Sequence, residues 1–242
     1  MGKTKKINRV NRKKSSKKNI NKLKNKLQLN SVLFTEKPKT FIVGYGSLIN
    51  TKSRLNTGKQ NIGKAIPIIV KSNANLKRAW NFQKNNLTAL GLQNSLTGSN
   101  INGVLYPVFS NISDFDEREK GYYRFKLSID NLKAINRDLL PRYNCDIFIY
   151  MLKPRFQKQR PQKHLPILQS YVDKVIIGCL EYNIDFARRF INTTYGWNKY
   201  FLNDRQDNSN SYKITDSLLK ENLPKSKSCL MSKPKNKFIM LK

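Results

Sequence analysis

The sequence predicts an α+β domain with a mixed or barrel-like sheet, and three observations lead to that class. Strand-like segments occupy most of the central part of the chain, segments with helical spacing follow them, and basic stretches without acids lie at both ends. Hydrophobic residues make up 38% of the 242 residues, which is enough to build a core. The sequence shows no internal repeat.

Seven segments read as strands because they are short, apolar and bounded by residues that favour turns. In chain order they are Thr40–Gly44, Ile66–Lys71, Leu76–Phe82, Thr88–Leu92, Gly103–Phe109, Tyr122–Ile129 and Asp146–Leu152. Between the fifth and sixth of them, the polar stretch 111–119 predicts a short helix with Ser113 as its N-cap.

Two helices are predicted after the strands. Apolar residues in Pro166–Tyr182 recur at helical spacing, and Pro166 suits a first turn. A second helix capped by Asp185 would bury Phe186, Phe190 and Ile191. The Asn-, Ser- and Lys-rich chain from 206 onward predicts an extended tail, with one or two helical turns over Ser217–Leu223.

The charge is strongly basic and unevenly distributed. Lys and Arg number 47 against 15 Asp and Glu, a formal charge of +32; the first 30 residues hold twelve basic residues and no acid, and 222–242 hold six Lys and no acid. We therefore expect a disordered basic arm over 1–37, a folded domain over 38–205 and a basic extended tail over 206–242. Lys and Asn are both abundant, as in proteins encoded by AT-rich DNA.

Such a charge attracts nucleic acid or another polyanion whatever its origin. The arm contains no base-reading motif, so we expect contact with phosphates that is blind to sequence, through Arg12, Lys13, Lys14, Lys17 and Lys18. This basic run also resembles a nuclear localisation signal.

Three Cys and one His argue against a disulfide-stapled module, a His-based triad or a multi-His metal site. No apolar run is long enough to span a membrane, and an intracellular setting is expected (cytoplasm, nucleus or virion).

The first segment with possible chemistry is Gly44-Tyr45-Gly46-Ser47-Leu48, at the end of the first predicted strand. Two glycines let the backbone turn sharply and approach a ligand, and successive N–H groups can hold a carboxylate or an oxyanion. A tight turn that binds no ligand uses the same residues, and the residue types alone favour this plain turn over a binding loop.

The second segment runs from Asp116 to Arg124 and holds three of the chain's acids, among them Glu117 and Glu119. Acids beside basic residues commonly form a solvated turn. A carboxylate that faces an apolar pocket would instead be able to act as a general acid or base near neutral pH. If the segment is helical, Glu117 and Glu119 point to different faces, so one of them at most faces a pocket.

Taken together, four short motifs in register resemble the gamma-glutamylcyclotransferase-like proteins. They are Phe41–Ile49, Leu76–Trp80, Gly103–Val108 and Phe115–Tyr122. Pro166–Asp173 and Thr193–Trp197 are similar to the helical extension of a eukaryotic branch of the family. Members specific for glutathione usually carry a second glycine where this chain has Tyr122.

The resemblance implies a small mixed β-barrel with flanking helices and an enzyme that releases 5-oxoproline from a γ-glutamyl peptide or amine. Glu119 would be the general acid/base, and Tyr45, Gly46, Ser47, Leu48 and Tyr123 would contact the substrate. The reaction needs no metal or cofactor. The alternative is a catalytically inactive member of this fold that acts as a basic structural or nucleic-acid-associated protein.

Overall fold

The computed structural model describes residues 37–58, 61–109, 111–135, 140–156, 160–206 and 210–223. Contacts divide the chain into two units, 1–38 and 39–242, and the elements below belong to the second. The five basic residues expected to contact nucleic acid lie outside the described ranges. Within those ranges, no helix has both the length and the apolar character that crossing a membrane requires.

Six strands form the first sheet, in the order β6-β8-β1-β5-β2-β7. Their bounds are β1 (Thr40–Gly44), β2 (Ile66–Val70), β5 (Ile101–Val108), β6 (Tyr122–Leu127), β7 (Leu132–Ala134) and β8 (Asp146–Leu152). The central strand β1 pairs antiparallel with β5 and parallel with β8. Because β5 is buried along its whole length, both faces of the sheet are covered at its centre.

Five strands form a second sheet, in the order β10-β3-β4-β9-β11. Their bounds are β3 (Leu76–Lys84), β4 (Leu87–Asn94), β9 (Ile167–Leu168), β10 (Thr194–Tyr195) and β11 (Phe201–Leu202). The β3–β4 hairpin turns at Asn85 and Asn86, whose φ angles are 52° and 60°. Asn tolerates this left-handed conformation better than most residues, which explains a two-residue turn without glycine.

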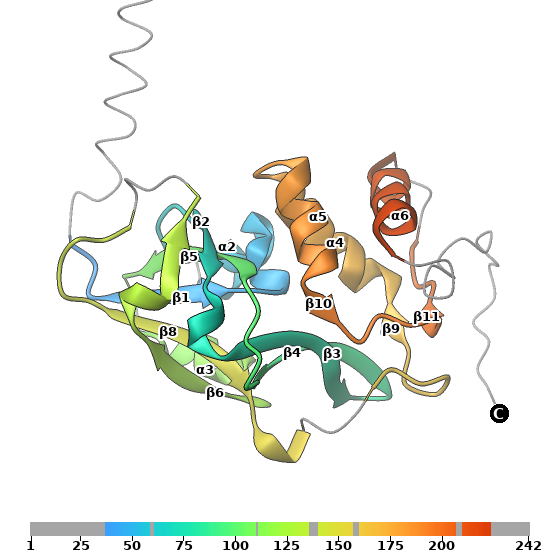
Figure 1. Ribbon diagram of the computed structural model, residues 1–242, viewed down its shortest axis with the longest axis horizontal. Helices are drawn as coiled ribbons and strands as arrows, with labels where there is room; N and C mark the ends of the chain where they lie inside the picture. The colour runs from blue at the N-terminus through green and yellow to red at the C-terminus, as the bar shows by residue number, and fades with distance from the viewer. Residues whose placement is uncertain are drawn as a thin grey trace, which may run out of the picture. The chain divides into compact units, whose positions relative to one another are not determined.

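The helices are α2 (Thr51–Thr57), α3 (Ser113–Arg118), α4 (Gln169–Leu180), α5 (Ile184–Asn192) and α6 (Asn210–Asn222), with a short 3-10 turn η1 (Ser47–Ile49) after β1. Three of the helices, α4, α5 and α6, stand side by side above the second sheet in Figure 1, whereas α3 lies among the strands of the first sheet. Apolar residues of α4, α5 and α6 join one core with residues of β1, β3 and β5. The helices at the end of the chain are thereby part of the folded unit.

The predicted α+β class is confirmed, and the strands β1 and β8 have the bounds that the sequence predicts. The sheet around β1 is mixed, as the sequence predicts, and the strands are divided between two sheets. The helix expected from Pro166 begins at Gln169, because Ile167 and Leu168 pair in the second sheet as β9. Both expected caps are one or two residues off: Ile112 occupies the N-cap of α3, and the Asn183 side chain caps α5.

The extended tail expected from 206 is instead helical over α6. Leu218 and Leu219 of α6 are buried in the core, and an ion cluster fixes the segment that precedes the helix. Arg205 lies 2.7 Å from Asp173 of α4 and 2.8 Å from Asp216 of α6. The helical turns expected over Ser217–Leu223 fall on the second half of α6, and the helix begins earlier than expected because the polar composition of this segment conceals its long-range partners. Residues 224–242 lie outside the described ranges.

Candidate active site

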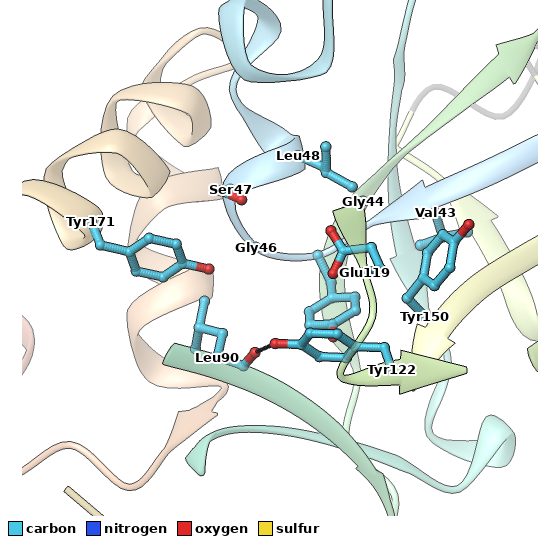
Figure 2. Close-up of a pocket in the computed structure, with 11 residues that line it drawn as sticks. Val43, Gly44, Gly46, Ser47, Leu48, Leu90, Glu119, Tyr122, Tyr150 and Tyr171 are labelled. Atoms are coloured by element: carbon cyan, nitrogen blue, oxygen red, sulfur yellow. Dashed lines mark hydrogen bonds between the residues drawn. The ribbon is translucent and has the colours of Figure 1, made fainter. Parts of the chain in front are cut away.

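Both candidate segments meet in one pocket (Figure 2). Its walls are formed by Val43, Gly44, Tyr45, Gly46, Ser47, Leu48, Leu90, Glu119, Tyr122, Tyr150 and Tyr171. The cavity is about 40 Å³, enough for a few water molecules and far below the ~300 Å³ or more of sites for drug-sized ligands. Only a small group can therefore enter it without movement of the walls.

The loop after β1 forms one wall because its glycines permit close packing. A Cβ on Gly44 would lie 2.9 Å from the Cβ of Leu48 and 3.0 Å from its backbone, so the turn into η1 requires glycine. A Cβ on Gly46 would lie 3.3 Å from the Tyr171 hydroxyl. The loop thus brings its backbone directly against the opposite wall.

A buried arginine fixes this loop from behind. Arg78 of β3 is fully buried and donates to the carbonyl oxygen of Tyr45 at 3.0 Å, and to the backbone and side chain of Asn102 at 2.8 and 3.0 Å. It also donates to Thr193, Thr194 and the carbonyl oxygen of Phe190. Since burial is not offset by a carboxylate among these partners, the pKa of Arg78 falls to about 9.

Glu119 reaches the pocket from the end of α3. Phe115 of that helix is fully buried and anchors it, and the chain turns at Glu119 toward β6. The Glu119 side chain is 16% exposed, whereas that of Glu117 is 77% exposed and pairs with Lys120. The structure therefore brings Glu119 and not Glu117 to the loop, although β1 and α3 are some seventy residues apart.

Tyrosines form most of the remaining wall. Figure 2 shows the Tyr171 hydroxyl and the Glu119 carboxylate pointing toward one another across the pocket. Burial and the negative charge of Glu119 raise the pKa of Tyr171 to about 12, while hydrogen bonds with Ser47 oppose the rise. Tyr122 donates to the carbonyl oxygen of Leu90 at 2.6 Å, and burial raises its pKa. The neutral hydroxyl group of Tyr171 thus faces the carboxylate, whereas that of Tyr122 is bound to Leu90.

Of the residues predicted to contact a substrate, Tyr45, Gly46, Ser47 and Leu48 line the pocket together with Glu119. Tyr123 does not line it: its hydroxyl lies 3.7 Å from Sδ of Met151. As its neighbour Tyr122 faces the pocket, strand alternation turns Tyr123 away.

Sequence reasoning missed four residues at or beside the pocket: Leu90, Arg118, Tyr150 and Tyr171. Their local patterns resemble an ordinary strand, charged turn or helix start. Only the tertiary arrangement brings them together.

The arrangement joins one carboxylate, four tyrosine rings and a glycine loop, which suits proton transfer to and from a small polar group. Among the described residues, no group of three metal-ligating side chains occurs. A larger groove of about 670 Å³ between β7 and α5 is open and lacks a comparable set of acid–base groups.

No protein-family model matches the sequence. No curated protein matches it either. Several solved structures are similar in fold, three of them as follows. The first is YkqA from Bacillus subtilis, with 15% sequence identity and a TM-score of 0.45. The matched region covers 63% of this chain and 52% of YkqA. This chain therefore spans about half the length of YkqA.

The second structure is a gamma-glutamyl cyclotransferase, at 12% identity and a TM-score of 0.46, covering 73% of this chain and 98% of the other. The third is an uncharacterized protein, loc79017, from Homo sapiens, at 14% identity and a TM-score of 0.43, covering 72% and 95%. At these identities and TM-scores the similarities assign neither a substrate nor a catalytic residue to this chain.

Proposed function

We propose that this protein is a γ-glutamyl cyclotransferase, which releases 5-oxoproline from a γ-glutamyl compound with Glu119 as general acid/base. The observation that carries the proposal is the meeting of the Glu119 carboxylate and the Gly44–Leu48 loop in one small pocket. Such a pocket can hold an α-ammonium group beside a carboxylate and a carbonyl oxygen beside backbone N–H groups.

In the proposed reaction the substrate attacks itself. Glu119 takes a proton from the α-ammonium group, and the resulting amine attacks the γ-carbonyl carbon to close a five-membered ring. The bond between this carbon and the leaving nitrogen then breaks as Glu119 gives its proton to that nitrogen. The ring nitrogen, which still carries one proton too many, passes it through the same carboxylate to the departing amine. The products are 5-oxoproline and an alkylammonium ion, so two protons have moved from the attacking to the leaving nitrogen and atoms and charge balance without a co-reactant.

The walls contribute by folding the substrate and by excluding water. Holding the amine next to the carbonyl carbon removes much of the barrier, because the attack is intramolecular. The tyrosine rings offer apolar faces to the methylene groups, and loop N–H groups would stabilise the developing oxyanion. Because the cavity is only about 40 Å³, the leaving group would remain at the mouth.

The test is release of 5-oxoproline from a panel of γ-glutamyl peptides and amines, with wild type, Glu119→Gln and Glu117→Gln compared. We expect Glu119→Gln to lose at least a hundredfold in kcat, as removal of a general acid/base commonly does. The matched control Glu117→Gln, whose side chain is exposed, should retain wild-type activity. Absence of product from a folded wild-type protein on every substrate would refute the proposal.

A second function is suggested by the twelve basic residues among the first 30, which no acid balances. In this reading Arg12, Lys13, Lys14, Lys17 and Lys18 bind nucleic acid without regard to sequence. Binding should fall steeply with added salt and disappear when residues 1–30 are removed. Unchanged binding after this truncation would contradict a role of the arm.

A further inference from the structure

A second cavity lies next to the elements that follow the Gly44–Leu48 loop. It opens between α2, the segment 62–65 that precedes β2, and residues 181–182 just after α4, and we call it the α2 cavity. Its volume is about 310 Å³, against about 40 Å³ for the pocket that contains Glu119. Among the described residues, none lines both cavities. The α2 cavity thus has the size of a small-molecule site, separate from the candidate active site.

Two charged side chains of the α2 cavity are satisfied by the protein itself. Arg54 is 4% exposed and donates to the carbonyl oxygens of Leu48, at 3.0 Å, and of Ile49. The Glu181 carboxylate accepts hydrogen bonds from the backbone N–H of Thr51, at 3.1 Å, and from its hydroxyl. These two opposite charges hold α2 in place, and together they leave no net charge for a ligand.

The third charge in this cavity has no partner in the described part of the chain. Lys64 is exposed, and no ion pair or hydrogen bond of the described residues involves its ammonium group. The Tyr182 hydroxyl accepts from Arg54 at 3.5 Å and keeps its own hydrogen to donate, since burial raises the pKa of Tyr182. Lys64 and Tyr182 therefore offer an ammonium group and an O–H donor, which one carboxylate can accept together.

Apolar side chains form another part of the lining. Leu55 of α2 is 38% exposed, Ile62 is partly buried, and Ala65 is buried. Covering this surface favours a ligand with a hydrocarbon body. Phosphate or another dianion would lose hydration beside these side chains and would be repelled by the Glu181 carboxylate in the same cavity. A single negative charge on an apolar body fits both parts of the lining.

From this arrangement we propose that the α2 cavity is a second binding site, which takes a small monocarboxylate with an apolar body. The carboxylate pairs with Lys64 and accepts from Tyr182, and the apolar body covers Leu55 and Ile62. The site goes beyond the proposed reaction and does not depend on it.

A ligand in the α2 cavity would also reach the loop of the candidate active site. Arg54 lines the cavity and holds the carbonyl oxygen of Leu48, which lines the pocket with Glu119. Binding next to Arg54 should therefore change the environment of the peptide groups that it holds. Their N–H groups belong to Ile49 and Asn50, so the NMR signals of these two amides should shift.

The test is an NMR titration of the full chain with isocaproate and with its neutral amide, isocaproamide, which has the same apolar body. We expect the acid to bind about tenfold more tightly, as one charge-assisted contact allows, and to shift the Ile49 and Asn50 signals. Lys64→Gln should weaken binding of the acid alone and so remove the preference, whereas Leu55→Ser should weaken binding of both ligands. The control Lys133→Gln removes an exposed charge from the groove between β7 and α5 and should change neither affinity.

Equal binding of acid and amide by wild type, no binding of either, or an unchanged preference in Lys64→Gln would refute the site. Loss of binding in Lys133→Gln would place the acid in the other groove and refute it as well. Bound acid without shifts of Ile49 and Asn50 would overturn the contact with the loop. None of these measurements needs turnover, so they stand apart from the outcome of the 5-oxoproline assay.

Discussion

Replacing Arg78 with Met should destabilise the fold by roughly 3–4 kcal/mol. Six hydrogen bonds join its guanidinium to three backbone carbonyls, the Asn102 side chain and two threonine hydroxyls. Each buried acceptor that loses its donor costs about 1–3 kcal/mol, and removal of the buried charge, whose desolvation lowers the pKa of Arg78 to about 9, offsets part of that cost. Met fills the space but leaves several buried acceptors without donors.

The assay is urea unfolding followed by tryptophan fluorescence, because Trp80 is buried on the same strand as Arg78. Arg78→Lys should lower the free energy of unfolding by about half as much as Arg78→Met, since an ammonium group has fewer donors than a guanidinium. Lys133→Met, which removes an exposed charge, serves as the control. A variant Arg78→Met as stable as wild type would show that the burial cost equals or exceeds the hydrogen bonding, as in some buried ion clusters.

Three further predictions concern the pocket and the helices. Because the pKa of Tyr171 is raised to about 12 in the folded protein, this tyrosine ionises at lower pH in the unfolded chain. Its stabilising contribution of roughly 2 kcal/mol is therefore present below pH 10 and is lost as the pH approaches 12. In Tyr171→Phe the free energy of unfolding should accordingly fall less between pH 10 and 12 than in wild type. Unfolding at pH 9 and 11.5 measures this, with exposed Tyr195→Phe as control; parallel losses in wild type and variant would contradict it. Arg205→Met should lower the free energy of unfolding by about 3 kcal/mol, because it leaves the Asp173 carboxylate buried without its cation. A decrease of less than about 1 kcal/mol, measured by urea unfolding, would refute this prediction. Gly44→Ala should lower the free energy of unfolding by roughly 2 kcal/mol, because the new Cβ would clash with the Leu48 backbone. Gly46→Ala should lower it less, because the atoms around Gly46 are farther away. A Gly44→Ala variant as stable as wild type would exclude the clash.

The sequence predicted the strands well because their apolar residues and bounding turns are local signals. Glycine pairs and acids in a basic chain also drew attention to the Gly44–Leu48 loop and to the acids of 116–119, but only the family resemblance selected Glu119 over Glu117. The two-residue strands β9, β10 and β11 escaped prediction because they exist only through pairing with distant strands. The polar helix α2 escaped for a related reason, whereas the short helix α3 was expected from the stretch 111–119.

Helix α2 shows this clearly. Its residues are polar, and it is held by the Asn50 cap and by buried Arg54, which donates to the carbonyl oxygens of Leu48 and Ile49. Arg78 illustrates the same limit in a strand: a charged side chain is usually exposed, yet here it is fully buried on the strand face that carries Leu76 and Trp80. The partners that permit burial lie on other elements, so no local pattern could reveal them.

The position of Tyr171 has a consequence for the order in which the protein matures. The loop wall of the pocket comes from β1 and η1, and Glu119 directly follows α3, but Tyr171 belongs to α4, which follows all of them in the chain. A nascent polypeptide that has emerged only through β8 already carries the loop and Glu119, and still lacks the side that faces them. The pocket should therefore become able to bind a ligand only after α4, which carries Tyr171, has left the ribosome.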